Sequence, residues 1–139
     1  MRRISVFIVF IMLSMGCLAQ SGAVKKAADA VFSLTTFKSD GSILATSNGV
    51  FVGTDGTAIS PWQPFVGASS AVVVDSKGAK HDVTALIGAN GIYDLAKFQV
   101  ADKVPAGVAL SSTTLPANTQ IWVVPNKKSD APKSTKVTS

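Results

Sequence analysis

The sequence predicts an all-β protein, a six-stranded antiparallel barrel preceded by a short N-terminal helix. Two observations favour this fold class. Short runs rich in β-branched and aromatic residues follow one another along the chain, and clusters of Gly, Asn, Asp and Ser separate them. Six such strands at close spacing are typical of a barrel or a sandwich. The 139 residues provide enough material for one domain with a modest core.

The first 19 residues have the features of an export signal. Arg2 and Arg3 precede the apolar run from Ile4 to Met15, which is too short to span a bilayer comfortably. Cleavage after Ala19 is favoured, because signal peptidase needs a small residue there. Two alternatives stay open: Cys17 receives a lipid at a poorly matching lipobox, or the segment remains as an uncleaved anchor. We therefore expect an exported protein that is periplasmic or secreted, with a lipoprotein anchored through Cys17 as the alternative.

Composition excludes several kinds of site. Cys17 is the only cysteine, so processing after Ala19 leaves no thiol for disulfides, metal binding or nucleophilic catalysis. One His and scattered Asp residues do not form a ligand set, so no metal or other cofactor is expected. The formal charge of +5 falls to +3 without Arg2 and Arg3, and no aromatic residues are interleaved with the lysines. Nucleic acid is therefore not an expected partner, and a membrane is one only if Cys17 is lipidated.

The predicted elements follow in order. Residues 23–30 (AVKKAADA) are rich in alanine and predict the helix. Turn-forming residues at 39–42, at Asp55-Gly56, at 76–78 and at 88–91 separate the strands, and a bulge is expected near Asn48-Gly49. The six expected strands are Val31 to Phe37, Leu44 to Val52, Thr57 to Ser60, Ala71 to Asp75, Lys80 to Ile87 and Tyr93 to Val100.

These strands predict one barrel core over residues 31–100. Burying a large apolar side chain stabilises the fold by about 1.5–3 kcal/mol. The expected core residues are Phe32, Leu34, Val50, Val52, Ile59, Val72, Val74, Leu86, Leu95 and Phe98.

The chain changes character after the barrel. A connection from Pro105 to Pro116 leads to a further strand, Gln120 to Val124. Residues 125–139 are rich in Lys, Ser, Thr and Pro and offer nothing that could bury a core, so a linker or a disordered tail is expected there. The predicted division is a signal peptide at 1–19, a barrel domain at 20–124 and a tail at 125–139.

Several motifs occur in an order and spacing known from one family. They are Asn48-Gly49-Val50-Phe51-Val52, Thr54-Asp55-Gly56, the stretch ISPWQPFVGA from Ile59 to Ala68, Gly88, and Asp94-Leu95-Ala96-Lys97-Phe98. With these motifs, residues 24–124 resemble the first barrel of a trypsin-like (chymotrypsin-fold) serine protease of the bacterial HtrA (Deg) type. The resemblance implies that Gln120 to Val124 is the first strand of a second barrel that is missing from these 139 residues.

The same resemblance places Gln63 where the family carries its general-base histidine. A serine hydroxyl must lose its proton as it attacks a carbonyl, and the acceptor needs a pKa near neutrality. A glutamine amide has no such basicity, and Pro61 and Pro64 remove two backbone donors beside it. Asp94 matches the carboxylate that orients the histidine, although an aspartate that caps the turn into the last barrel strand is the structural alternative.

Other candidate residues do not replace the missing base. The family's nucleophile lies in its second barrel within Gly-Asn-Ser-Gly-Gly, whose amides also form the oxyanion hole, and the sequence contains no such motif. His81 is expected to be exposed on a strand away from Gln63. Trp62 is either a ligand contact or a plug for the cleft, and both interpretations stay open. No intact catalytic residue is therefore expected, with Gln63 and Asp94 as vestigial positions.

Three functions follow from these features. The first is an exported, catalytically inactive protease-like domain (a pseudoprotease), with a peptide or an unfolded protein as its partner. The second is the N-terminal part of a longer serine endopeptidase whose second barrel is not included. The third is a generic exported β-barrel binding module. The sequence favours the first, and peptide hydrolysis by this chain is not expected.

Overall fold

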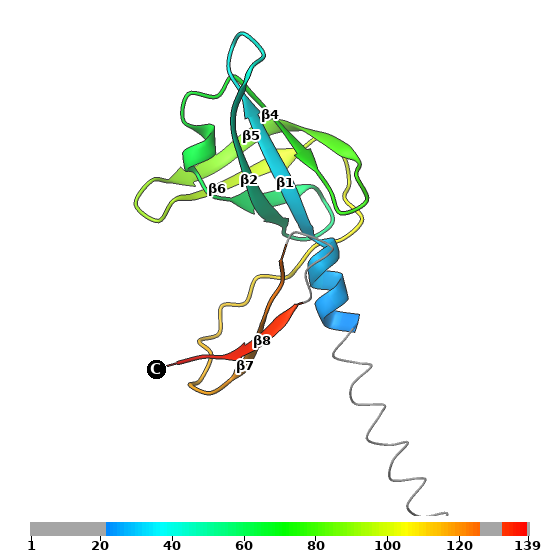
Figure 1. The fold of residues 1–139 in the computed structure, drawn as a ribbon, viewed down its shortest axis with the longest axis vertical. Coiled ribbons are helices and arrows are strands. Elements are labelled where there is room, and N and C mark those ends of the chain that lie inside the picture. Colours follow the sequence, from blue (N-terminus) through cyan, green and yellow to red (C-terminus); the bar gives the residue numbers. More distant parts are fainter. Residues whose placement is uncertain (1–21, 126–131, 139) are drawn as a thin grey trace, which may run out of the picture.

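The computed structural model describes residues 22–125 and 132–138, and the predicted signal peptide at 1–19 lies outside them. Residues 22–29 form the short helix that the sequence predicts (Figure 1). No helix in the described part of the chain is long and apolar enough to cross a membrane. The strands are β1 Val31–Phe37, β2 Ile43–Phe51, β3 Thr57–Ser60, β4 Ser70–Val74, β5 Lys80–Asn90, β6 Leu95–Val100, β7 Gln120–Val123 and β8 Lys133–Lys136.

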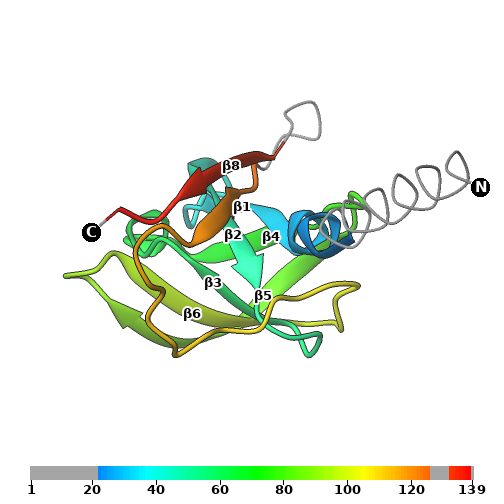
Figure 2. The same cartoon turned by 90° about the horizontal axis from the view of Figure 1, so that it is seen from below.

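Strands β1 to β6 form a closed barrel in the order β1-β2-β3-β6-β5-β4. Every neighbouring pair is antiparallel. The barrel consists of two three-stranded meanders, β1 to β3 and β4 to β6, which the β1–β4 and β3–β6 pairs join into one ring (Figure 2). The predicted six-stranded antiparallel barrel is confirmed.

Phenylalanine rings fill most of the barrel interior. Phe32, Phe51 and Phe98 are fully buried, and the centroid of the Phe32 ring lies 4.6 Å from that of Phe51 and 6.0 Å from that of Phe98. Tilted and edge-to-face contacts of this kind are favourable for aromatic rings. Leu34 and Val73 pack against the same cluster. The predicted burial of Phe32, Leu34 and Phe98 is confirmed.

Three strands turn the opposite face inward from the one predicted. Strand β2 buries Phe51, β3 buries Ala58 and β4 buries Val73. Both faces of these strands carry apolar residues, so alternation alone does not identify the inward face, and a shift of one residue moves every side chain to the other face. The predicted core is therefore wrong for the half-buried Val50, Val52, Ile59, Val72 and Val74, and for Leu86 and Leu95, which are both 47% exposed.

Gly49 does not mark a bulge, contrary to expectation. It pairs in regular register with Phe32, and a Cβ atom at this position would overlap the Phe32 ring and approach the carbonyl oxygen of Ile59 to 2.5 Å. A glycine is needed here because an aromatic ring lies directly over the backbone. The β1–β2 register shifts instead between Thr36 and Phe37, close to the hairpin turn.

Strand β5 is longer than predicted and continues through the expected turn at residues 88–90. The turn forms after it, where Asn90 Oδ1 accepts hydrogen bonds from the amides of Ile92 (3.0 Å) and Tyr93 (3.1 Å). An asparagine side chain that bonds to the backbone ahead of it is a common turn device. Strand β6 consequently begins at Leu95 rather than at Tyr93.

Part of the segment predicted to be a linker or a disordered tail is ordered. Strand β8 lies within it and pairs antiparallel with β7 to form a separate two-stranded sheet. All four residues of β8 are exposed, so the pairing depends on backbone hydrogen bonds rather than on burial. The composition of the segment contains no information on backbone pairing, so the sequence did not predict β8.

Candidate functional site

The loop at the predicted site is a short 3₁₀ turn fixed to the barrel by one buried hydrogen bond. The turn, η1, spans Gln63–Phe65 and follows β3 after Pro61. Pro64 is buried within it, and the hydroxyl of Thr36 on β1 donates a hydrogen bond of 2.8 Å to the Pro64 carbonyl. Thr36 is itself fully buried. The two prolines restrict the backbone of the turn, and the hydrogen bond from Thr36 fixes the turn at the barrel.

The structure brings Gln63 and Asp94 together, although they are 31 residues apart in the sequence. The backbone amide of Gln63 donates a hydrogen bond of 2.7 Å to Asp94 Oδ1. Asp94 lies in the turn before β6 with a φ of 48°, in the left-handed region that few residues other than Gly, Asn and Asp adopt readily. A carboxylate that accepts from a backbone amide makes a charge-assisted hydrogen bond. The contact therefore joins the 3₁₀ turn to the β5–β6 turn.

The chemistry of this pair is limited. The carboxylate of Asp94 is oriented by a backbone group, and the side chain at position 63 is an amide that does not accept a proton near neutral pH. Asp94 can thus hold a loop in place, and Gln63 can hydrogen-bond to a ligand. The Gln63 side chain therefore provides no general base.

Trp62 directly precedes this turn and is half-buried. Its ring stacks on Phe65 with a centroid distance of 6.2 Å and an interplanar angle of 11°, and Phe65 in turn contacts the core residue Phe98 at 5.2 Å. Gly91 lies on another side, where an added Cβ would be 3.9 Å from Trp62 Cδ1. Packing therefore holds the indole in place while part of it stays accessible to solvent. Both predicted roles, ligand contact and plug, are compatible with this position.

His81 is buried, and the prediction of an exposed histidine is wrong. Only 7% of the residue is exposed, because the β4–β5 register places it opposite Val73 with its ring edge-on to Phe51 at 6.3 Å. A signal for this orientation is present in the sequence. Lys80 and Asp82 flank His81, and a strand that turns two charged residues outward turns the residue between them inward.

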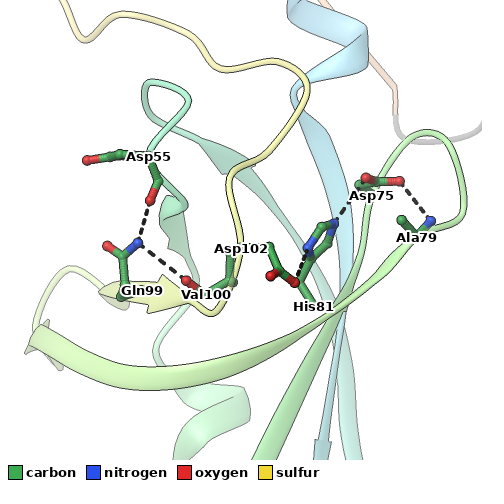
Figure 3. A network of polar contacts seen from close by, with 7 residues as sticks. All are labelled: Asp55, Asp75, Ala79, His81, Gln99, Val100 and Asp102. Carbon is green, nitrogen blue, oxygen red and sulfur yellow. Dashed lines mark hydrogen bonds and ion pairs between the residues drawn. The ribbon is translucent and has the colours of Figure 1, made fainter.

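Two carboxylates flank the buried imidazole (Figure 3). The Nε2 atom of His81 lies 3.1 Å from Asp75 Oδ2, and its Nδ1 atom lies 3.6 Å from Asp102 Oδ2. Burial by itself would raise the pKa of Asp75, but hydrogen bonds from His81 and from the amides of Ala79 and Lys77 outweigh burial and hold this pKa below its ordinary value. Within residues 22–125 and 132–138, no group of three or more His, Cys, Asp and Glu side chains is arranged to hold a metal ion.

The closed barrel and its chain order define the class of fold, a chymotrypsin-like protease barrel. The solved structure of a serine endoprotease from Yersinia pestis is similar, with a TM-score of 0.63 and 20% sequence identity. The similarity covers 82% of this chain and 41% of that chain. No protein-family model matches the sequence, and no curated protein matches it either. The chain thus shares a protease barrel fold and spans less than half the length of the solved endoprotease.

Proposed function

We propose that this chain is a catalytically inactive protease barrel that binds an extended peptide or an unfolded protein beside Trp62. The observation that carries the proposal is the contact between the Gln63 amide and Asp94. It keeps the turn where the resemblance expects a general base, while the side chain on that turn is an amide. This contact supports a loop arranged like that of a protease site but without its proton acceptor.

Two further features support the absence of hydrolysis. The 139 residues contain no Gly-x-Ser-Gly sequence that could present a nucleophile and the amides of an oxyanion hole. The one histidine, His81, is buried between Asp75 and Asp102 and is engaged there. These features support the proposal that the chain has no base, nucleophile or oxyanion donors for hydrolysis.

The binding half of the proposal rests on the setting of Trp62. An aromatic ring that is held by stacking on Phe65 and is half-exposed loses little conformational freedom on contact with a ligand. Such anchored aromatic residues often contribute most of the affinity at a binding surface. Val66 and Tyr93, which are 50% and 78% exposed, add apolar surface at the ends of the two neighbouring turns.

Activity and binding are tested separately. We expect no labelling by a fluorophosphonate probe and no cleavage of an unstructured protein, both for the native chain and for Gln63→His, since a restored histidine still lacks a nucleophile. Specific serine labelling, or cleavage that disappears on Asp94→Ala, would overturn the inactive assignment.

Binding is measured by fluorescence anisotropy of a labelled unstructured peptide. Truncating a central tryptophan contact weakens binding by about tenfold or more, so we expect this loss for Trp62→Ala. Trp122→Ala is the matched control, because Trp122 lies on β7 outside the barrel and its loss should leave the affinity unchanged. Equal affinities of the two variants would contradict the proposed site.

One alternative function is supported by a separate observation. The β7–β8 sheet is separate from the barrel, and the chain spans 41% of the solved endoprotease. Both facts favour an N-terminal part of a longer serine endopeptidase, whose reading frame would continue beyond Ser139 into a second barrel with Gly-x-Ser-Gly. Gln63 would leave that protein without its base as well. The Gln63–Asp94 contact favours either protease-like interpretation over a generic barrel module.

The N-terminal segment supports a proposal for where the protein is located. We propose export, with signal peptidase cleavage after Ala19 and a mature chain that begins at Gln20. The intact mass of protein recovered from an exporting host tests this step. A mass that includes a diacylated Cys17 would show lipoprotein processing instead.

A further inference from the structure

We propose that His81 links residues 101–108 to the end of the barrel in a proton-dependent way, an arrangement called the clasp below. When both ring nitrogens carry protons, His81 bridges Asp75 and Asp102. When the ring is neutral, only the Asp75 link remains. The inference goes beyond the proposed binding function and does not depend on it. It rests on the geometry of three side chains that come from three different parts of the barrel (Figure 3).

The first link is fixed in both protonation states of the ring. Asp75 Oδ1 accepts the backbone amides of Lys77 (2.8 Å) and Ala79 (2.9 Å), which leaves Oδ2 to face His81 Nε2 at 3.1 Å. A carboxylate only accepts hydrogen bonds, so the proton of the neutral imidazole lies on Nε2. The Asp75 link is therefore present whether or not the ring is charged.

The second link depends on the proton. In the neutral ring Nδ1 is a bare acceptor, it is buried, and it has no hydrogen-bond partner in the described structure. It faces another acceptor, Asp102 Oδ2, at 3.6 Å. Protonation turns Nδ1 into a donor aimed at a carboxylate, so one proton converts a repulsive contact into a charge-assisted hydrogen bond.

In the part of the chain that the structure describes, the charged groups within ion-pair distance of His81 are Asp75 and Asp102. Asp75 approaches from the end of β4 and Asp102 from the segment after β6, while the packing partner from β2 is the ring of Phe51. Lys80 and Asp82 flank the histidine on β5, but both are exposed and belong to the opposite face of the strand.

The segment held by Asp102 closes one end of the barrel. The amide of Ala101 bonds to Asp82 O at 3.0 Å, that of Val104 to Thr54 O at 3.3 Å, and that of Val108 to Phe51 O at 2.9 Å. Val104 is buried. Because this segment gains the Asp102–His81 link only when Nδ1 carries a proton, we expect it to be held more tightly when the ring is protonated than when the ring is neutral.

Amide hydrogen exchange of the full chain, measured by NMR and corrected for the intrinsic rate, tests the clasp. Asp102 is largely exposed, with 69% of its side chain accessible, so the expected gain is modest. We expect the amides of Val104 and Val108 to be roughly two- to fivefold more protected at about pH 5.5 than at about pH 8. Amides of β1 report on the fold as a whole and should show no such change.

Two variants separate the clasp from a general charge effect. Asp102→Asn should abolish the acid-side gain, because its amide can donate to the bare Nδ1 and hold the link in the neutral state as well. Asp82→Asn removes the same charge from the opposite face and should keep the gain. Equal protection of the native chain at both pH values, or a gain that persists in Asp102→Asn, would overturn the proposal.

Discussion

Replacing Thr36 by valine tests whether one buried hydroxyl holds the site loop on the barrel. Valine keeps the shape of the side chain but removes the donor of the 2.8 Å hydrogen bond to the Pro64 carbonyl. Both residues are buried, so the carbonyl is left without this donor where water does not easily replace it. Leaving a buried acceptor unsatisfied costs about 1–3 kcal/mol, and the added methyl group returns less than about 0.8 kcal/mol. We therefore expect the free energy of unfolding to fall by about 1–2 kcal/mol.

Urea denaturation of Thr36→Val, followed by circular dichroism, measures this loss directly. In a domain of this size each kcal/mol also lowers Tm by about 4–8 °C. The matched control is Thr35→Val, which makes the same chemical change one residue earlier, on the half-buried opposite face of β1. Its effect should stay within about 0.5 kcal/mol. If Thr36→Val were as stable as Thr35→Val, the Pro64 carbonyl would not depend on this donor, and the account of how the loop is positioned would be wrong.

Two other predictions concern the barrel itself. Gly49→Ala should destabilise the fold by about 1–3 kcal/mol, because its Cβ overlaps the Phe32 ring, whereas the control Gly88→Ala adds a Cβ in open space and should be close to neutral in urea denaturation. The lowered pKa of Asp75 means that its ionised form adds stability above its ordinary pKa, and that this contribution is lost as the pH falls through the lowered value. Asp75→Asn should therefore be less stable than the native chain at neutral pH and lose less on acidification, and parallel pH profiles of the two free energies of unfolding would contradict this.

The sequence predicts the barrel well because its strands and turns are local features. The bounds of β1 and β3 agree with the prediction, and six strands close into an antiparallel barrel as expected. The inward face is harder to predict. Ala58 lies inside and Ile59 is half-exposed, since the volume inside is taken by phenylalanine rings from other strands. Which residue of such a pair faces inward is decided by tertiary packing rather than by hydrophobicity.

The sequence also predicts the candidate site only in part. The resemblance matches Gln63 and Asp94 to two positions that interact in the family, and the Gln63 amide contacts Asp94 in the structure, because the positions of turns along a barrel determine which loops meet. The surroundings of His81 were not predicted. Asp102 reaches His81 through a segment without regular structure, and a sequence pattern contains no information on where such a segment crosses the barrel.

The way the barrel is closed has a kinetic consequence. Each meander can form from neighbouring hairpins, but the ring is complete only when β1 meets β4 and β3 meets β6, which brings together residues as far apart as Thr57 and Gln99, 42 positions away. The entropy of closing those long loops is lost before their contacts are gained, so barrels of this topology fold in about milliseconds to seconds. Until β4 has paired with β1 and β6 has paired with β3, the β1 to β3 meander keeps at least one unpaired edge. During that interval the unfinished half-barrel is the species most exposed to aggregation.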